Sequence, residues 1–203
     1  MEVATVVPVK AFSLAKQRLS GTLDPPTRAR LARWMAERVI AAASRTSIHI
    51  ACDDDEVRDW ALDLGAAVRW GPGLGLDGAV DDAVAFVVSE GADHVVVSHA
   101  DLPLATPLID VTRRGWATLV PDRRRDGTNV IAYPADAVVA AGYGPGSFRR
   151  HLARSTAIGP TEVRADPLLA HDVDEPAHLL DPRLREVLPP WLPTIPDNPT
   201  NPA

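Results

Sequence analysis

The chain has 203 residues, of which 46% are hydrophobic, and a formal net charge of -6 at pH 7. This length and composition suit one compact domain, or one domain with a tail, and they exclude global disorder. The negative charge argues against nucleic acid as the main partner, because a phosphate backbone favours a basic protein surface.

The cysteine content and the start of the chain bear on location. The single cysteine, Cys52, allows no intramolecular disulfide, so we expect a reducing, cytoplasmic environment. The first ten residues lead into a β-branched run and lack the basic start and long apolar stretch of a signal peptide. No apolar run approaches the roughly 20 residues that span a bilayer, so we expect no membrane partner.

In the first half of the chain, short apolar runs alternate with amphipathic repeats. The runs predict strands at residues 3–9, 47–52, 67–70 and 93–98. Helical spacing predicts helices over residues 25–44 and 57–64, and a third helix from about residue 77. Asp24 precedes two prolines and is the expected N-cap of the first helix, because its carboxylate can accept from free backbone N–H groups.

The second half of the chain continues this alternation. Strands are predicted at residues 117–120, 129–133 and 161–164, with a further short strand at 168–173. Helices are predicted at residues 147–155 and 176–180. Strands that alternate with helices imply an α/β domain with a mostly parallel sheet flanked by helices.

The end of the chain is rich in proline, at residues 182, 189, 190, 193, 196, 199 and 202. Such sequence favours extended backbone. We therefore expect a domain over residues 1–180 and a tail over residues 181–203 that is not part of the core. The tail is compatible with an arm onto a partner subunit in a homodimer, but no motif supports one.

Three cations follow the first predicted strand of a chain that is otherwise acidic. Lys10, Lys16 and Arg18 lie where an open α/β sheet binds its ligands, beyond the carboxyl end of a strand. They could grip a triphosphate and offset the charge of a departing pyrophosphate. No P-loop signature is present, and the spacing alone fits a solvated basic loop equally well.

Asp101 follows the most apolar strand, within the sequence His99-Ala100-Asp101-Leu102-Pro103. A carboxylate in this position is costly to bury unless it is paired or binds a metal ion. Magnesium prefers a few carboxylates together with phosphate oxygens, which makes Asp101 a candidate ligand. A helix cap is the alternative role for Asp101, and we expect His99 to pack or form hydrogen bonds rather than ligate metal.

A second acidic segment comes late in the chain. Asp172 and Asp174 are two residues apart, so on extended backbone their side chains point the same way. With Asp101 they could hold two magnesium ions between a nucleotide and an acceptor. The alternative for Asp174 is an N-cap of the helix that begins at Glu175-Pro176.

Two glycine-bearing loops complete the candidate site. Asp126-Gly127-Thr128-Asn129 opens a strand, and the loop over residues 142–147 leads into a helix with Ser147 as its expected N-cap. A helix N-terminus presents free N–H groups and is a natural phosphate or carboxylate site. Most glycine-rich turns are simply turns, so these loops matter because of the aspartates beside them.

Six segments in order, VPVK, AKQRL, HADLPL, DGTN, YGPGSFRRH and DVDEPAHL, form a fairly specific pattern over about residues 3–180. The pattern resembles the guanylyltransferases of coenzyme F(420) biosynthesis, which act on 2-phospho-L-lactate or phosphoenolpyruvate. The resemblance implies a single-domain, nucleotide-diphospho-sugar transferase-like (GT-A type) fold with a mostly parallel mixed sheet. It implies magnesium ligands at Asp101, Asp172 and Asp174, acceptor contacts at Thr128, Gly144 and Ser147, and nucleotide contacts at Pro8, Lys10, Lys16, Arg18 and Gly75.

One position departs from the family pattern. An Asn is expected two residues after Gly75, and this chain has Asp77. An amide both donates and accepts hydrogen bonds, whereas a carboxylate only accepts, so nucleotide choice would differ if this position reads the base or ribose. The run Arg123-Arg124-Arg125 is also unusually basic; it fits a solvated segment or one that steers an anionic acceptor.

The mechanism implied is attack by an acceptor phosphate oxygen on the α-phosphorus of GTP. A phosphate monoester is already anionic at neutral pH, so no general base is required, and Lys10, Lys16, Arg18 and Asp101 would act by overcoming charge repulsion. The motifs do not choose between the two acceptors. The amino-acid composition is typical of proteins from GC-rich genomes, and this favours phosphoenolpyruvate. Two alternatives stay open: a sugar- or polyol-phosphate nucleotidyltransferase, which usually has a glycine-rich signature after the first strand, and a non-catalytic nucleotide-binding paralogue.

Overall fold

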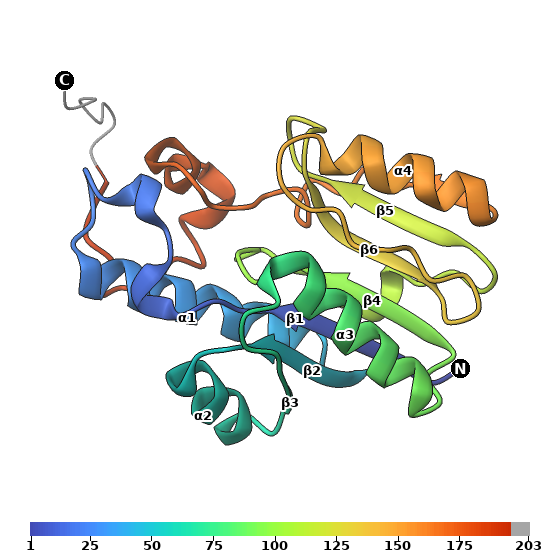
Figure 1. Ribbon diagram of the computed structural model, residues 1–203. Coiled ribbons are helices and arrows are strands. Elements are labelled where there is room, and N and C mark those ends of the chain that lie inside the picture. Colours follow the sequence, from blue (N-terminus) through green and yellow to red (C-terminus); the bar gives the residue numbers. More distant parts are fainter. Residues whose placement is uncertain (196–203) are drawn as a thin grey trace.

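The computed structural model describes residues 1–195, which contain one seven-stranded sheet flanked by helices (Figure 1). The strands are β1 (Val3–Pro8), β2 (Ser47–Cys52), β3 (Ala67–Trp70), β4 (His94–Ser98), β5 (Ala117–Pro121), β6 (Thr128–Pro134) and β7 (Thr161–Val163). Their order is β3-β2-β1-β4-β6-β5-β7, and β6 runs antiparallel to both of its neighbours. The other neighbouring strands are parallel, which confirms the predicted mostly parallel sheet.

The helices cover both faces of this sheet. They are α1 (Pro25–Ala42), α2 (Asp55–Asp63), α3 (Gly75–Ser89) and α4 (Ser147–Ile158), with short 3-10 turns η1 (Phe12–Leu14), η2 (Gln17–Leu19), η3 (Leu108–Val111), η4 (Pro176–Leu180) and η5 (Pro182–Leu184). The Asp24 carboxylate accepts from the Thr27 N–H at 2.7 Å, which confirms the predicted N-cap of α1. No helix within residues 1–195 combines the length and the apolar character needed to cross a membrane.

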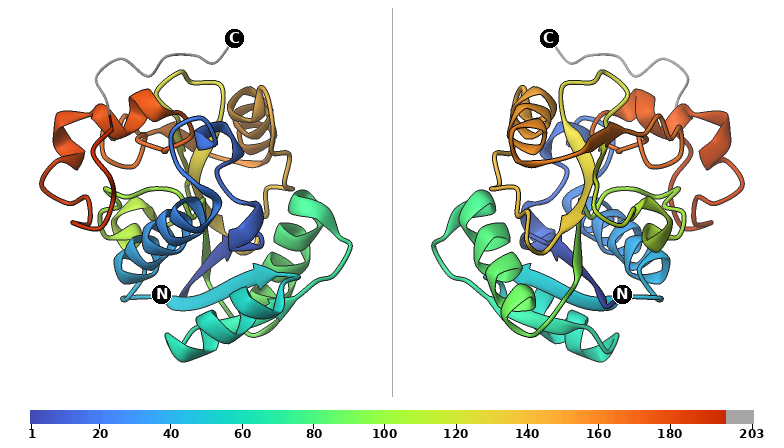
Figure 2. Two further views of the ribbon diagram at one scale, coloured as in Figure 1. Left: turned by 90° about the vertical axis from the view of Figure 1, so that its left-hand side faces the viewer. Right: turned by 90° about the vertical axis from the view of Figure 1, so that its right-hand side faces the viewer.

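The core lies on both sides of the sheet, and β1 shows how. Val3 and Val7 pack toward α1, α2 and η3, whereas Ala4 and Val6 pack toward α3 and α4. This alternation follows from the two-residue period of a strand. Figure 2 shows α1 and α3 on opposite sides of the sheet. Burial of both faces explains why the central strands read as continuous apolar runs in the sequence.

The polar segments lie together where β1 and β4 end, and this side of the sheet is called here its polar edge. β1 and β4 are parallel neighbours, so their carboxyl ends meet there, and the chain continues from β4 into His99 and Asp101. β6 runs the other way and begins at the same edge, where the His99 N–H donates to the Asn129 carbonyl at 2.9 Å. The strand order reverses direction between β1 and β4, and such a switch point is where open α/β sheets bind ligands.

Two local predictions are wrong. Residues 168–173 do not form a strand: residues 168–170 lie in a turn, in which the Asp166 carboxylate accepts from the N–H groups of Leu168 and Leu169, and residues 171–173 have no regular structure. Ser147 is the first residue of α4 and not its N-cap; Gly146 occupies the cap with a φ of 72°. The helix predicted from about residue 77 does form, and α3 begins at Gly75, within two residues of that start.

The segment after η4 also differs from its prediction. Residues 181–195 are not an isolated extended tail, because they pack beside α1 and η2 (Figure 1). Leu184 is fully buried in a cluster with Leu19, Leu31 and Met35. The prediction is wrong here because apolar residues between the prolines cover a side of α1 that the sheet leaves open. The rest of the predicted tail, residues 196–203, lies outside the described part of the chain.

Candidate active site

Two adjoining cavities open at the polar edge of the sheet. One, of about 490 Å³, is called here the Lys10 cavity, and the other, of about 580 Å³, the Thr128 cavity. Both are lined by Arg18, His99, Asp101 and Asp174. The Lys10 cavity is also lined by Pro8, Lys10, Phe12, Lys16, Met35 and Leu76, and the Thr128 cavity by Arg123, Gly127, Thr128, Asn129, Gly144, Ser147, Asp172 and His178. Molecules bound in the two cavities would therefore meet across shared side chains.

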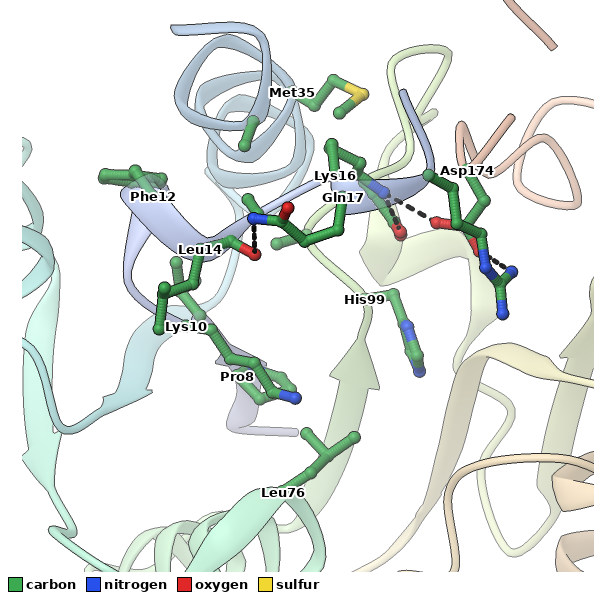
Figure 3. A pocket seen from close by; sticks show the side chains of 16 residues that line it. Pro8, Lys10, Phe12, Leu14, Lys16, Gln17, Met35, Leu76, His99 and Asp174 are labelled. Atoms are coloured by element: carbon green, nitrogen blue, oxygen red, sulfur yellow. Dashed lines mark hydrogen bonds and ion pairs between the residues drawn. The ribbon is translucent and has the colours of Figure 1, made fainter. Parts of the chain in front are cut away.

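The Lys10 cavity combines cations with an apolar wall. Figure 3 shows Lys10 and Leu76 at one end of it and Lys16 at the other. Phe12 anchors the loop between β1 and α1, since its ring packs edge-on against Trp60 at a centroid distance of 5.0 Å. The result suits a molecule with an anionic end and a flat, less polar end.

Lys16 joins the two cavities. Its ammonium donates to an Asp101 oxygen at 2.7 Å and to an Asp174 oxygen at 3.0 Å. Its backbone is left-handed, with φ 54° and ψ 41°, a conformation that residues other than glycine rarely adopt. Burial alone would lower the pKa of Lys16, but the two carboxylates outweigh it and raise that pKa. A charged lysine therefore holds segments 85 and 158 residues away in sequence.

The three candidate aspartates converge. Burial favours a raised pKa for Asp101, but the Lys16 ammonium holds that pKa below its ordinary value. The pKa of Asp172 is raised, first by burial and then by the negative charge of Asp101. The Asp101 carbonyl accepts from the Val173 N–H at 3.2 Å, which fixes the strand end of β4 beside the late acidic segment.

The aspartates are not all paired in the same way. Asp101 Oδ1 is buried and has no hydrogen-bond partner among residues 1–195, whereas its Oδ2 binds Lys16. Asp174 also lies 3.6 Å from the Arg18 guanidinium, and Asp172 accepts a long contact of 3.5 Å from the Asn129 amide. Within the described chain, no three His, Cys, Asp or Glu side chains are arranged to hold a metal ion as they stand.

The alternative role for Asp174 as a helix cap is wrong. The N-cap of η4 is Glu175, which forms a capping box with His178. The backbone N–H of Asp174 instead donates to His178 Nδ1 at 3.1 Å. The Asp174 side chain is thereby left to face Lys16 and both cavities.

The Thr128 cavity presents hydroxyl groups at the start of β6 and of α4. The Ser147 hydroxyl accepts from the Thr128 N–H at 3.1 Å. Thr128 Oγ1 lies 3.0 Å from Nδ1 of His151, which follows Ser147 by one turn of α4. Arg123 reaches across the cavity and donates to the Asp172 carbonyl at 2.9 Å. The cavity thus contains hydroxyl groups held in place and a cation, which suit a small anion.

Hydrogen bonds from charged side chains to the backbone hold the loop over residues 140–146, which forms one wall of this cavity. From α3, Asp77 accepts from the Tyr143 N–H and Asp81 from the Ala141 N–H, both at 2.8 Å. From α4, Arg150 donates to the carbonyls of residues 142, 143, 144 and 145. Gly144 has a φ of 90°, where a side chain would strain the backbone. The loop is therefore fixed from both sides.

The structure brings together most of the residues singled out from the sequence. The cavities include Pro8, Lys10, Lys16, Arg18, Asp101, Thr128, Gly144, Ser147, Asp172 and Asp174. It does not bring Gly75 or Asp77 to either cavity; Leu76 lies there instead, and the Asp77 carboxylate faces the backbone of Tyr143. The hypothesis that Asp77 reads the nucleotide therefore has no support in this geometry.

Sequence reasoning missed several residues of the site. Asn129 donates to the Leu169 carbonyl and contacts Asp172, and His178 lines the Thr128 cavity. His151 is buried behind Thr128. Asn129 and His151 belong to the DGTN and YGPGSFRRH segments, so both residues could have been singled out from these motifs. The pairing of β6 with β4, which brings this part of the chain to the site, was not visible in the sequence.

Comparisons with known proteins find similar sequences over most of the chain. The family model "Guanylyl transferase CofC like" matches residues 3–182. A phosphoenolpyruvate guanylyltransferase of Rubrobacter xylanophilus is 35% identical over 189 residues, which cover 88% of this chain and 92% of the relative. A 2-phospho-L-lactate guanylyltransferase of Methanothermobacter thermautotrophicus is 29% identical over 160 residues, covering 75% and 70% of the two chains.

Solved structures support the fold. A crystal structure of a nucleotide-diphospho-sugar transferase candidate from Desulfovibrio desulfuricans G20 superposes with a TM-score of 0.72 at 18% identity, over 91% of this chain and 89% of that one. The predicted nucleotide-diphospho-sugar transferase-like fold is thus confirmed. Taken with the family match over nearly the whole described chain, these findings show that the protein belongs to the family of CofC-like guanylyl transferases.

Proposed function

We propose that the protein transfers GMP from GTP to the phosphate of phosphoenolpyruvate and releases pyrophosphate, as a step of coenzyme F(420) biosynthesis. The observation that carries the proposal is the junction at Lys16, Asp101 and Asp174, where a cationic cavity meets a hydroxyl-lined one. The relative at 35% identity carries the same activity in its name, which supports this choice of acceptor.

In this proposal GTP occupies the Lys10 cavity. The base and ribose lie toward Pro8 and Leu76, and the triphosphate extends past Lys10 toward Lys16 and Arg18. Cations placed at the reacting end neutralise charge that moves onto the leaving pyrophosphate. Arg18 is largely exposed in its present position, so it is free to turn toward a phosphate.

The acceptor occupies the Thr128 cavity. Thr128 and Ser147 offer hydroxyl donors, and the backbone at Gly144 allows close approach because glycine has no Cβ. Arg123 supplies positive charge on the facing wall. Phosphoenolpyruvate and 2-phospho-L-lactate share a carboxylate and a phosphate, so both fit this chemistry, and the relative named for 2-phospho-L-lactate makes that acid the second candidate.

The residues present fit a divalent cation. Asp101 Oδ1 is buried without a partner among residues 1–195, and Asp172 carries a pKa raised by burial and by its acidic neighbours, which a cation would relieve. Magnesium would be held by Asp101 and Asp172, with Asp174 as the further ligand that the family resemblance implies. When bound, it would neutralise phosphate charge and orient the reacting groups.

The chain's own groups handle a problem of charge repulsion. A phosphate oxygen of the acceptor forms a bond to the α-phosphorus of GTP, and the bond from that phosphorus to the bridging oxygen of the β-phosphate breaks, so pyrophosphate leaves with the electron pair. Lys10, Lys16 and Arg18 offset negative charge on the nucleotide. Thr128 and Ser147 orient the nucleophile, and no proton needs to be removed from it.

Mass spectrometry of the products tests this proposal. The protein is incubated with GTP, magnesium and either phosphoenolpyruvate or 2-phospho-L-lactate, and pyrophosphate release is followed in parallel. We expect an enolpyruvyl-diphospho-guanosine and stoichiometric pyrophosphate. A product only with 2-phospho-L-lactate would move the activity to the second acceptor. Turnover only with sugar or polyol phosphates, or GTP binding with no product from any acceptor, would overturn the proposal.

A further inference from the structure

The two hydroxyl oxygens of the Thr128 cavity, those of Thr128 and Ser147, each already have a polar partner within the protein. The Ser147 oxygen receives the Thr128 N–H at 3.1 Å, and the Thr128 oxygen lies 3.0 Å from Nδ1 of His151. All three side chains are at most 2% exposed. The orientation of each hydroxyl proton is therefore set by what its oxygen already receives.

His151 can meet Thr128 in either of two ways. If Nδ1 accepts, the Thr128 proton points at the imidazole and the hydroxyl offers only lone pairs to the cavity. If Nδ1 carries the ring proton and donates, the Thr128 proton is free to point into the cavity. An anion gains a hydrogen bond in the second case and meets repulsive lone pairs in the first.

We propose that His151 is a positioning residue: its Nδ1–H donates to Thr128 so that Thr128 and Ser147 both present their protons to the anionic acceptor. The acceptor part of this inference rests on the proposed function. His151 lines neither cavity, so it does not touch the substrates itself, and its side-chain hydrogen bond is to Thr128.

The surroundings of His151 suit a neutral ring of fixed orientation. Its ring packs edge-on against Tyr143 at 4.9 Å, and Tyr143 packs in the same way against His99 at 5.0 Å. Burial, followed by the nearby charges of Arg154 and Arg150, lowers the pKa of His151 to about 4, against a smaller opposing effect of Asp77. At neutral pH the imidazole therefore carries one proton, and the question is which nitrogen holds it.

Nitrogen NMR of the unmodified protein answers that question directly. A long-range 1H–15N spectrum of histidine-labelled protein near neutral pH distinguishes a protonated Nδ1 from a protonated Nε2, and the loss of one signal set in His151→Asn gives the assignment. We expect Nδ1 of His151 to be protonated. A protonated Nε2 would overturn the inference, whatever the substrates prove to be.

Two matched amides provide the kinetic test. In His151→Asn the side-chain amide can reach the place of Nδ1, whereas in His151→Gln it lies one methylene further on. We expect His151→Gln to raise KM for phosphoenolpyruvate about ten-fold or more while KM for GTP is unchanged, because no donor then directs the Thr128 proton toward the charged ligand. His151→Asn should stay within about three-fold of the parent.

The outcomes separate this inference from the proposed function. Equal KM values for the acceptor in the two variants, or a parallel rise in KM for GTP, would reduce His151 to a packing residue. An unmodified protein that turns over no acceptor would refute the proposed function and leave the NMR result as the test of the hydrogen-bond direction. If His151→Gln fails to fold, the NMR measurement on the unmodified protein still decides the direction of the hydrogen bond between His151 and Thr128.

Discussion

Lys16 shows how one residue can organise this site. It is one of two residues other than glycine with positive φ among those described, and its ammonium is shared between Asp101 and Asp174. Left-handed backbone costs about 1 kcal/mol or more for such a residue, and it persists only where the surroundings fix it. The two carboxylates supply that fixing, so the geometry of the loop and the charge of the site depend on each other.

Replacing Asp101 is the most direct residue-scale test of the site. In Asp101→Asn we expect turnover to fall at least about 10²-fold, because the buried carboxylate at the junction of the two cavities loses its charge. The fold should survive, since an amide of the same size still contacts Lys16. Steady-state pyrophosphate release measures the loss, and circular dichroism checks the fold.

Asp63→Asn serves as the control for Asp101→Asn, because this exposed aspartate ends α2 far from both cavities. It should keep the parental rate. A near-parental rate for Asp101→Asn in the presence of magnesium would show that Asp101 has been assigned the wrong role.

Asp77 makes a second residue-scale prediction. Its carboxylate receives the Tyr143 N–H, so it should act on the loop and not on the choice of nucleotide. Asp77→Ala should raise KM for the acceptor about five-fold, within the range for losing one hydrogen bond to a charged group. Asp77→Asn should behave like the parent, because an amide oxygen also accepts.

Relative kcat/KM values for GTP, ATP and CTP are the measurement that separates these roles of Asp77. They should be the same in the parent and in both variants. A change of nucleotide preference in Asp77→Asn would restore the hypothesis, drawn from the sequence, that this position reads the base or ribose.

At the residue scale, charge was readable from the sequence and hydrogen-bond direction was not. Lys10, Lys16 and Asp101 stand out because lysine is rare here and because a carboxylate directly after an apolar strand needs a partner. The role of His151 depends on a contact across 23 residues, between a strand and a helix whose packing the sequence does not state. The hydrogen bond that Asp77 accepts was equally out of reach, because its partner Tyr143 lies 66 residues away.

At the scale of elements, the C-terminal segment acts as a packing element of α1. Arg30 of α1 lies over the ring of Trp191 at 4.1 Å, and Leu184 is buried beside Leu31. The same cluster includes Leu19, the last residue of η2, which follows Lys16 and Arg18 in the chain. The segment therefore supports the loop that carries two of the candidate catalytic cations.

A truncation of Leu184 tests this packing. Leu184→Ala should lower the free energy of unfolding by about 2–5 kcal/mol, the range for deleting a fully buried leucine side chain. Leu62→Ala, at an exposed position of α2, should change it by less than about 0.5 kcal/mol. Urea denaturation of both variants gives the comparison. Equal stability of the two would show that the segment does not contribute to the core.

The elements themselves were largely predictable. Seven of the eight predicted strands form, within a few residues of their expected bounds, because each is a short apolar run between polar turns. Residues 168–173 were mistaken for a strand because they form a short, largely apolar run, and apolar character alone does not specify backbone conformation. The direction of β6 was also out of reach, since nothing local distinguishes an antiparallel neighbour from a parallel one.

For the whole molecule, buried neutral histidines predict sensitivity to mild acid. Burial first, and arginines nearby, lower the pKa of both His151 and His171 to about 4, whereas an unfolded chain has an ordinary value near 6.5. The unfolded state therefore binds more protons between these values. The stability from these groups is fully present above about pH 6.5 and is lost as the pH falls toward about 4.

Each of the two histidines would contribute at most roughly 3 kcal/mol to this loss. Thermal or urea unfolding between about pH 7.5 and pH 5 should show the parent protein losing stability, and His151→Asn should flatten the curve because Asn does not titrate. Identical pH profiles for the parent and this variant would mean that His151 titrates normally in the folded state.

The packing of η2 against Leu184 has a consequence for biosynthesis. A growing polypeptide folds from its N-terminal end as it leaves the ribosome, so the sheet and α1 can form while Asp172, Asp174 and Leu184 are still inside the exit tunnel. Until then Lys16 has only one of its two carboxylates, and the loop around it lacks its cover. The nascent enzyme should therefore stay inert until Asp174 and Leu184 emerge and this segment docks.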